Sequence, residues 1–137
     1  MMSPMPCGIH TENDIMNTKI DWFEIPSSDF KRATKFYEAL FQTELRVEQT
    51  GPVKMAIFND PNGESCGCVA HAEQYQPGPN GIVIYLDASP SIDAVIARIE
   101  PNGGKIQMPK LELPNDIGFI AHFIDPEGNR LGLHAMA

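Results

Sequence analysis

The feature that most constrains the fold is a turn sequence that the chain states twice. Residues 58–71 read Phe-Asn-Asp-Pro-Asn-Gly-Glu-Ser-Cys-Gly-Cys-Val-Ala-His, and residues 123–136 read Phe-Ile-Asp-Pro-Glu-Gly-Asn-Arg-Leu-Gly-Leu-His-Ala-Met. Phe, Asp, Pro, Gly and a second Gly recur at one offset of 65 residues, as from Asp60 to Asp125. In each copy the Asp can bond its own turn backbone, the Pro presets φ, and the first Gly can adopt a left-handed conformation. Each copy predicts a β-hairpin corner followed by a strand, and the pair indicates an internal duplication.

Matched segments precede each copy and support the duplication. The first half begins with a strand near 19–25, a capping turn, and an amphipathic helix over 30–41 whose aromatic stripe predicts packing on a sheet. The second half repeats this order, with a strand at 81–87 and a helix at 91–100. Three more strands follow in each half, at about 43–49, 53–59 and 64–71, and at 104–111, 117–124 and 130–135. We therefore predict an α+β fold of two tandem βαβββ modules related by a pseudo-twofold axis.

Composition and spacing divide the chain into an arm and one domain. Residues 74–80 read Gln-Tyr-Gln-Pro-Gly-Pro-Asn and form the one clear linker. They divide a single domain, 18–137, into module one (18–73) and module two (81–137). Residues 1–17 show no convincing periodicity and are predicted to form an N-terminal arm. We expect the arm to lie on a surface, either of its own domain or, preferably, of a partner chain.

The composition excludes several classes of protein. The net charge of −8 argues against a nucleic-acid partner, whose phosphates would be repelled. No apolar run approaches the ~20 residues that span a bilayer, and residues 1–17 lack the features of a signal peptide. Cys66 and Cys68 lie two apart on one predicted strand, which is unfavourable for a mutual disulfide. We therefore expect a reduced, cytoplasmic protein.

Three motifs together resemble a known superfamily. They are Ser-Asp-x-x-Arg-Ala-x-x-Phe-Tyr at 28–37, Asn-Gly-Gly at 102–104 and Asp-Pro-Glu-Gly-Asn at 125–129. Their order and spacing resemble the vicinal oxygen chelate superfamily, which includes glyoxalase I, bleomycin-resistance proteins, fosfomycin-resistance proteins and extradiol dioxygenases. The resemblance covers roughly residues 18–136. It implies that the two βαβββ modules form a pseudo-twofold cup of curved mixed sheets.

The resemblance also implies where a metal would bind. Metal-dependent members hold a divalent ion with His, Glu or Gln from the first and last strand of each module. The matching positions here are Trp22 and Gly67 in module one, and Ile84 and Gly132 in module two. None of these side chains offers a lone pair to a hard or borderline cation. We therefore predict no metal at the family site and no cofactor.

The histidines leave two interpretations open. Strand alternation places His71 on the face of Gly67, and His134 on the face of Gly132. If the glycines face the cup, both histidines face it too, as displaced metal ligands or catalytic groups. Alternatively, both are polar residues at strand ends with a purely structural role. His122 lies near the second turn and could face either side.

Glu24 also has two interpretations. It shares the Trp22 face of the first strand, where a dry cup would raise its pKa and allow it to act as a general base. Alternatively, it pairs with a nearby cation such as Arg130, or it lies at the mouth of the cup.

The residues that remain at the predicted cup suit a small, partly apolar organic molecule. We predict a small-molecule-binding protein without the usual metal ligands. The predicted ligand-binding residues are Trp22, Glu24, Gly67, Val69, His71, Ile84, Arg130, Gly132 and His134. The alternative is a glyoxalase-like lyase or isomerase that uses a non-standard metal or acid–base site, with Glu24 and His134 as candidate catalytic residues. A collapsed cup without a ligand stays open as well.

The same resemblance implies a quaternary state. Family members of this size commonly associate so that their cups are completed between chains. We therefore predict a homodimer, with a small organic ligand and no nucleic-acid or membrane partner.

Overall fold

The computed structural model of the chain describes residues 20–59 and 65–137. The predicted arm and the first Asp-Pro-x-Gly turn therefore lie outside the described residues. The elements of module one are β1 (Phe23–Pro26), α1 (Phe30–Phe41), β2 (Arg46–Thr50), β3 (Val53–Asn59) and β4 (Ser65–His71). Those of module two are β5 (Tyr85–Asp87), α2 (Ile92–Ile96), the 3₁₀ helix η1 (Glu100–Asn102), β6 (Lys105–Glu112), β7 (Phe119–Ile124) and β8 (Arg130–Ala135).

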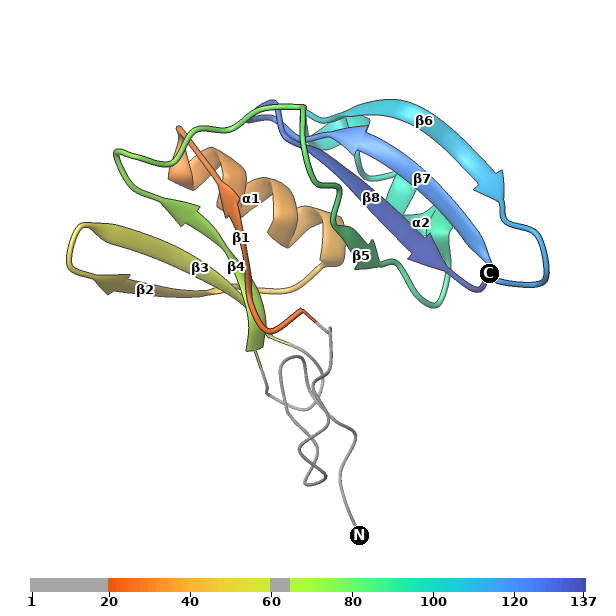
Figure 1. Cartoon of the computed structure of the whole chain (residues 1–137), viewed down its shortest axis with the longest axis horizontal. Coiled ribbons are helices and arrows are strands. Elements are labelled where there is room, and N and C mark those ends of the chain that lie inside the picture. Colours follow the sequence, from red (N-terminus) through yellow and green to blue (C-terminus); the bar gives the residue numbers. More distant parts are fainter. Residues whose placement is uncertain (1–19, 60–64) are drawn as a thin grey trace, which may run out of the picture.

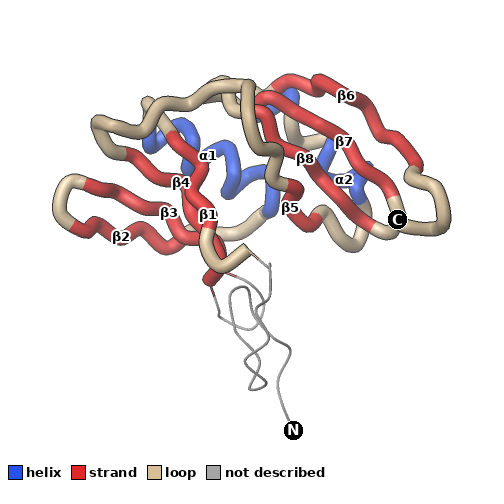
Figure 2. Tube along the Cα trace, in the orientation of Figure 1, coloured by secondary structure: helices blue, strands red, loops and turns tan. Residues whose placement is uncertain are grey.

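Each module contributes one four-stranded mixed sheet. The strand orders are β1-β4-β3-β2 and β5-β8-β7-β6, with the first pair parallel and the others antiparallel in both sheets. The two sheets lie side by side, and both helices lie behind them on the same side (Figures 1 and 2). The predicted α+β fold of two tandem βαβββ modules is confirmed.

Two predicted elements are shorter than expected. Of the strand expected at 81–87, only β5 forms strand hydrogen bonds. The helix expected at 91–100 consists of the short α-helix α2 and, after it, the 3₁₀ helix η1. Pro101 explains the second difference, because it lacks a backbone N–H and cannot continue an α-helix. Gly103 then closes η1 with a left-handed φ of 100°.

Local sequence sets the limits of α1. The Asp29 carboxylate caps the helix by accepting a hydrogen bond from the backbone N–H of Arg32 at 3.1 Å. The helix ends where Gln42 adopts a left-handed conformation, with φ of 52°. Its buried stripe packs with the facing strands of both modules and with α2 into one core. Phe36 and Tyr37 of α1 lie 5.9 and 6.5 Å from the ring of Phe123 on β7, so the helix of module one also supports the sheet of module two.

The turn between β7 and β8 joins the two modules. Asp125 is buried, and its carboxylate accepts hydrogen bonds from the Tyr37 hydroxyl at 2.8 Å and from the Asn129 amide at 3.1 Å. The carboxylate of Glu127 accepts from the backbone N–H of Asp29 and from Arg32 Nε, at 2.8 and 2.6 Å. Burial alone would raise the pKa of Glu127, but these hydrogen bonds lower it on balance. The Asp-Pro-Glu-Gly-Asn motif is therefore the attachment between module two and the start of α1.

A β-bulge breaks the repeat in module one. On β3 and β4, Asn59 pairs with Ser65 and Phe58 pairs with Gly67, which leaves Cys66 as an extra residue. The corresponding pairing in module two, on β7 and β8, has no such insertion. Beyond the bulge, equivalent residues of the two modules are therefore separated by one residue fewer than the offset of 65.

Backbone hydrogen bonds confirm the shifted offset. The N–H of Ser27 donates to Ala70 O at 2.9 Å, and the N–H of Ala88 donates to His134 O at 2.8 Å. Ala70, and not His71, is therefore the counterpart of His134. One inserted residue exchanges the two faces of a strand, because successive side chains point to opposite sides.

Candidate functional site

Each sheet has a helix face, which packs on α1 or α2, and an open face, which is turned away from the helices (Figure 1). On β8, Leu131, Leu133 and Ala135 belong to the core and therefore lie on the helix face. Since successive side chains of a strand point to opposite sides, the alternate residues Arg130, Gly132 and His134 lie on the open face. The predicted grouping of these three residues on one face is thus present in the structure.

Tyr85 and His122 meet across Gly132 on the open face of module two. Both residues pair with Gly132, Tyr85 from β5 and His122 from β7. A Cβ at Gly132 would overlap the Tyr85 ring, so the glycine lets this ring lie directly on β8. The Tyr85 hydroxyl lies 2.5 Å from His122 Nε2, and their ring centroids are 5.3 Å apart. Burial, followed by the charge of Arg130, lowers the pKa of His122 and favours its neutral form.

Arg130 is a cation of this face. Its Nε is enclosed and has no hydrogen-bond partner among the described residues. None of the ion pairs between described residues involves Arg130. An enclosed donor without an acceptor costs about 1–3 kcal/mol. A molecule from outside cannot reach the enclosed Nε, but it can approach the terminal nitrogens of the guanidinium, which form no ion pair among the described residues.

A cavity of about 530 Å³ lies at the other end of β8. Tyr85 and His134 line it together with Leu86, Asp87, Leu113 and Ile120. The ring of His134 is 2.7 Å from Ile117 O, so its Nε2–H donates to this carbonyl and the ring is held in place. The carboxylate of Asp87 accepts from the backbone N–H of Ser89 at 2.9 Å. The cavity therefore has a mainly apolar wall with oriented polar groups at its rim, as ligand sites commonly do.

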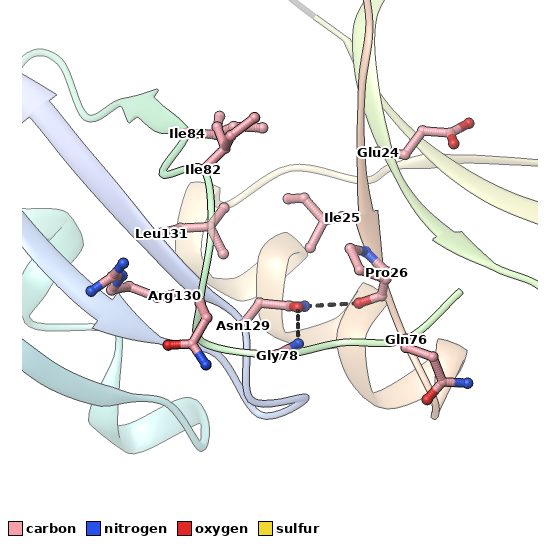
Figure 3. A pocket seen from close by; sticks show the side chains of 11 residues that line it. Glu24, Ile25, Pro26, Gln76, Gly78, Ile82, Ile84, Asn129, Arg130 and Leu131 are labelled. Atoms are coloured by element: carbon pink, nitrogen blue, oxygen red, sulfur yellow. Dashed lines mark hydrogen bonds between the residues drawn. The ribbon is translucent and has the colours of Figure 1, made fainter. Parts of the chain in front are cut away.

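A second cavity, of about 220 Å³, lies at the junction of the two modules (Figure 3). Asn129 anchors this junction, because its amide donates to Pro26 O at 2.8 Å and accepts from the N–H of Gly78 at 3.0 Å. Ile25 and Leu131 point into the space, whereas the charged heads of Glu24 and Arg130 point away from it in opposite directions (Figure 3). The junction is thus a small apolar gap between two separate polar surfaces.

The open face of module one is covered by the linker. Tyr75 packs on a small cluster formed by Ile57, Cys68 and Ala70. Its hydroxyl donates to Glu24 Oε1 at 2.6 Å, and Trp22 Nε1 donates to the other carboxylate oxygen at 3.3 Å. The structure thus groups the predicted residues Trp22 and Glu24, but the partners of Glu24 are two aromatic side chains and not Arg130.

Cys68 lies beneath this cover. Burial, followed by the charge of Glu24, raises the pKa of its thiol to about 12. A thiol with such a pKa is not a nucleophile near neutral pH. Cys68 is therefore a packing residue of the covered face.

The expectation that Gly67, Val69 and His71 face the cup is wrong. Gly67 lies beneath the ring of Phe23, and Val69 is fully buried in the core beside α1. The bulge at Cys66 is the physical reason, because it turns these positions onto the helix face. His71 follows the same alternation, and its Nδ1 lies 2.8 Å from Ser27 O at the end of β1.

Three residues of the open faces were not predicted as site residues. Tyr85 lies on the face where Ile84 was expected, because Tyr85 is the residue that pairs with Gly132. The carbonyl of Ile84 instead accepts a hydrogen bond from the N–H of Gly132 at 2.9 Å, and its side chain lines the junction cavity. The sequence analysis did not assign His122 to either face of the sheet. Its buried apolar neighbours Ala121 and Phe123 nevertheless indicate that it lies on the polar side of an alternating strand. Tyr75, in the linker, carried no sequence signal.

The residues at the family's metal positions do not fit a metal. Trp22, Ile84, Gly67 and Gly132 supply no side-chain ligand, and Gly67 lies on the opposite face from Trp22. Within residues 20–59 and 65–137, no group of three or more His, Cys, Asp or Glu side chains could hold an ion. A catalytic metal requires about three protein ligands, which this donor set does not provide.

Comparison with known proteins identifies the family. Residues 19–133 match the family described as the Glyoxalase/Bleomycin resistance protein/Dioxygenase superfamily, and the chain belongs to this superfamily. Over 118 residues it is 30% identical to a Mycobacterium tuberculosis protein named "Putative glyoxylase CFP32", and the match spans 82% of this chain but 44% of that relative. It is 28% identical over 120 residues to a "Glyoxylase-like domain-containing protein" of Didymella fabae, covering 84% of this chain and 91% of that one.

Solved structures agree on the fold. A glyoxylase/bleomycin resistance protein/dioxygenase domain from Frankia sp. EAN1pec superposes with a TM-score of 0.65 at 16% identity, covering 88% of this chain and 93% of that one. At this identity the likeness concerns the fold alone. None of the helices in the described part of the chain is long and apolar enough to cross a membrane.

Proposed function

We propose that this protein binds a small organic molecule on the open face of module two, without the metal that many of its relatives use. The observation that carries the proposal is Arg130, whose enclosed Nε lacks an acceptor among the described residues beside the Tyr85–His122 pair. The cavity at the other end of β8, which Tyr85 also lines, has a volume of about 530 Å³ and so falls within the usual size range of small-molecule sites. Membership in a superfamily with small-molecule-binding relatives supports the same function.

The proposal is tested by mapping fragment binding with two-dimensional NMR. Fragments should shift the signals of Tyr85, His122 and Gly132. Ile120→Trp should fill the cavity and abolish these shifts, since Ile120 pairs with His134 at its wall. The matched control is Met55→Trp, at the corresponding position of module one. Fragment shifts that are confined to module one would refute the proposal.

An enzymatic function is the second candidate, supported by the Tyr85–His122 hydrogen bond of 2.5 Å. A neutral histidine bonded to a tyrosine can accept or deliver a proton at a bound molecule. The earlier candidates are less suitable, because Glu24 is bonded to Tyr75 and Trp22, and His134 donates to Ile117 O. Incorporation of solvent deuterium into a bound fragment, abolished by His122→Ala, would establish this function. No exchange over many hours would exclude it for the fragment tested.

We also propose that the chain forms a homodimer in the cytoplasm and has no nucleic-acid partner. Exposed apolar side chains support association, in particular Ile82 at 91% exposure and Trp22 at 38%. The unpaired thiol of Cys68 suits a reducing compartment, and the charge of −8 disfavours nucleic acid. Light scattering over a wide concentration range should give twice the monomer mass. A strict monomer at high micromolar concentration would refute the dimer.

A further inference from the structure

We propose that the molecule bound on the open face of module two is an organic carboxylate, held by Arg130 while its apolar body lies against Tyr85 and Ile120. This inference rests on the proposed function and adds the chemical class of the ligand. It follows from four observations: the half-buried guanidinium of Arg130, the absence of an acidic partner for it among the described residues, the Tyr85–His122 pair, and the position of the Tyr85 ring over Gly132.

Arg130 differs from every other arginine of the chain. Arg32 pairs with Glu127 at 2.6 Å, Arg46 pairs with Glu48 at 3.0 Å, and the guanidinium of Arg98 donates to Leu40 O at 3.0 Å. Arg130 is half-buried, and no described residue accepts from its Nε. Partly buried guanidinium groups are normally paired, and the terminal nitrogens of Arg130, which have no ion-pair partner among the described residues, are the groups that a ligand could pair with.

The acidic side chains that line the neighbouring cavities already have partners. Both carboxylate oxygens of Glu24 accept hydrogen bonds, and its head points away from Arg130 (Figure 3). Asp87 accepts from the N–H of Ser89 at the far end of β8. None of these described carboxylates serves Arg130, so another molecule can supply its acceptor, and the positive charge of the guanidinium favours an anion at this point.

The geometry of a guanidinium favours a carboxylate. Its two terminal nitrogens lie in one plane and can donate two parallel hydrogen bonds, which match the two oxygens of a carboxylate. His122 adds a third donor nearby. If the Tyr85 hydroxyl donates to His122 Nε2, the neutral ring carries its proton on Nδ1, for which the structure gives no partner among the described residues.

The apolar part of the ligand has a surface beside this anion site. Gly132 has no side chain, so the Tyr85 ring lies flat across β8 and is 44% exposed. Ile120 and Leu113 continue this surface into the cavity. A flat aromatic or aliphatic group attached to the carboxylate would contact both.

The test compares 2-naphthoate with its neutral isostere 2-naphthamide, by calorimetry and by NMR of the full chain. We expect naphthoate to bind at least tenfold more tightly than the amide. Arg130→Gln should remove this preference, and Arg130→Lys should restore only part of it, because a lysine cannot form two parallel hydrogen bonds. Arg46→Gln is the control, since it removes a charge from an ion pair on β2 and should leave the affinity unchanged. Naphthoate binding should also raise the pKa of His122 in an NMR titration, because the anion offsets the charge of Arg130.

The outcomes separate the two proposals. Equal affinity for the acid and the amide, both shifting Tyr85, His122 and Gly132, would overturn the carboxylate while leaving the proposed function in place. A tenfold preference for phenyl phosphate over benzoate would also overturn it, in favour of a phosphoryl group. If neither naphthalene probe shifts these signals at millimolar concentration, and no fragment does so, both proposals fail. Circular dichroism must show that each variant is folded.

Discussion

The open faces of the two modules are built on one plan but differ in polarity and in cover. Strand pairing aligns five positions of module one with five of module two: Glu24 with Tyr85, Met55 with Ile120, Ile57 with His122, Cys68 with Gly132, and Ala70 with His134. On module one most of these residues are apolar, and Tyr75 of the linker packs over them. On module two most are polar or small, and no such cover is present among the described residues.

This difference suggests how a duplicated domain can divide its tasks. A covered apolar face adds to the hydrophobic stabilisation of the fold, at ~25 cal/mol for each Å² of apolar surface removed from water. The other face can then retain groups that cost stability, such as the enclosed Nε of Arg130 and a histidine held neutral. Module one therefore adds the hydrophobic stabilisation of a covered face, and module two carries the candidate site.

The largest change in the free energy of unfolding is expected at the turn between β7 and β8, which joins the two modules. Asp125→Ala should lower the free energy of unfolding by about 3–5 kcal/mol, because the buried Tyr37 hydroxyl and the N–H groups of the turn would lose their acceptor. Denaturant unfolding measures the change. The control is Asp93→Ala, which removes an exposed ion pair with Lys110 and should cost less than about 1 kcal/mol. Equal losses for both variants would show that the turn does not hold the modules together.

The second prediction uses the two glycines that the bulge places on opposite faces. Gly67→Ala should destabilise by about 1–3 kcal/mol, because the new Cβ overlaps the Phe23 ring within the packed core. Gly132→Ala should cost clearly less, because the overlapping Tyr85 ring is 44% exposed and can turn outward. It should instead separate Tyr85 from His122 and weaken ligand binding. Thermal unfolding and calorimetry of both variants check the two effects, and a reversed order of stability would contradict the assignment of faces.

Much of the fold could be predicted from sequence because the repeated turn and the helix stripe are local signals. Asp125, Pro126 and Gly128 specify a corner through their own backbone preferences. The face of Gly67 could not be predicted in this way. It depends on one extra residue, Cys66, opposite Asn59 and Phe58, and a bulge is a property of strand pairing that the strand's own sequence does not reveal.

The candidate site was predicted only in part, for the same reason. Arg130, Gly132 and His134 share a face because β8 is regular, and simple alternation was sufficient there. Ile84 was selected by counting along the chain, whereas the pairing with Gly132 places Tyr85 on that face. Tyr75 reaches Glu24 from an irregular linker, where no periodicity exists to guide a prediction.

The third prediction concerns the cover of module one. Tyr75→Phe should lower stability by about 0.5–1.5 kcal/mol, the contribution of one hydrogen bond, while leaving the ring in place. The hydrogen bond to Glu24 raises the pKa of Tyr75, so this phenol should ionise at higher pH than in a Glu24→Gln variant. Absorbance of the phenolate at alkaline pH measures the shift. A Tyr75 pKa that is unchanged in Glu24→Gln would mean that the cover is not held by this bond.

The smallest expected effect is a pH dependence that only module two should show. Burial, followed by the charge of Arg130, lowers the pKa of His122 below the 6.5 of an unfolded chain. The unfolded state therefore binds this proton more readily than the folded state. The resulting stability is fully present above pH 6.5 and is lost as the pH falls through the folded pKa.

Replacing His122 with the residue of module one should remove this dependence. In His122→Ile, the melting temperature should fall less between pH 7 and pH 5 than in the wild type, because no proton is taken up at this position. The Tyr85 hydroxyl loses its partner in this variant, but it is exposed and can bond water. The converse variant, Ile57→His, places an imidazole on the covered face and should create a steeper acid dependence. Parallel pH profiles for the wild type and His122→Ile would show that the acid sensitivity arises elsewhere.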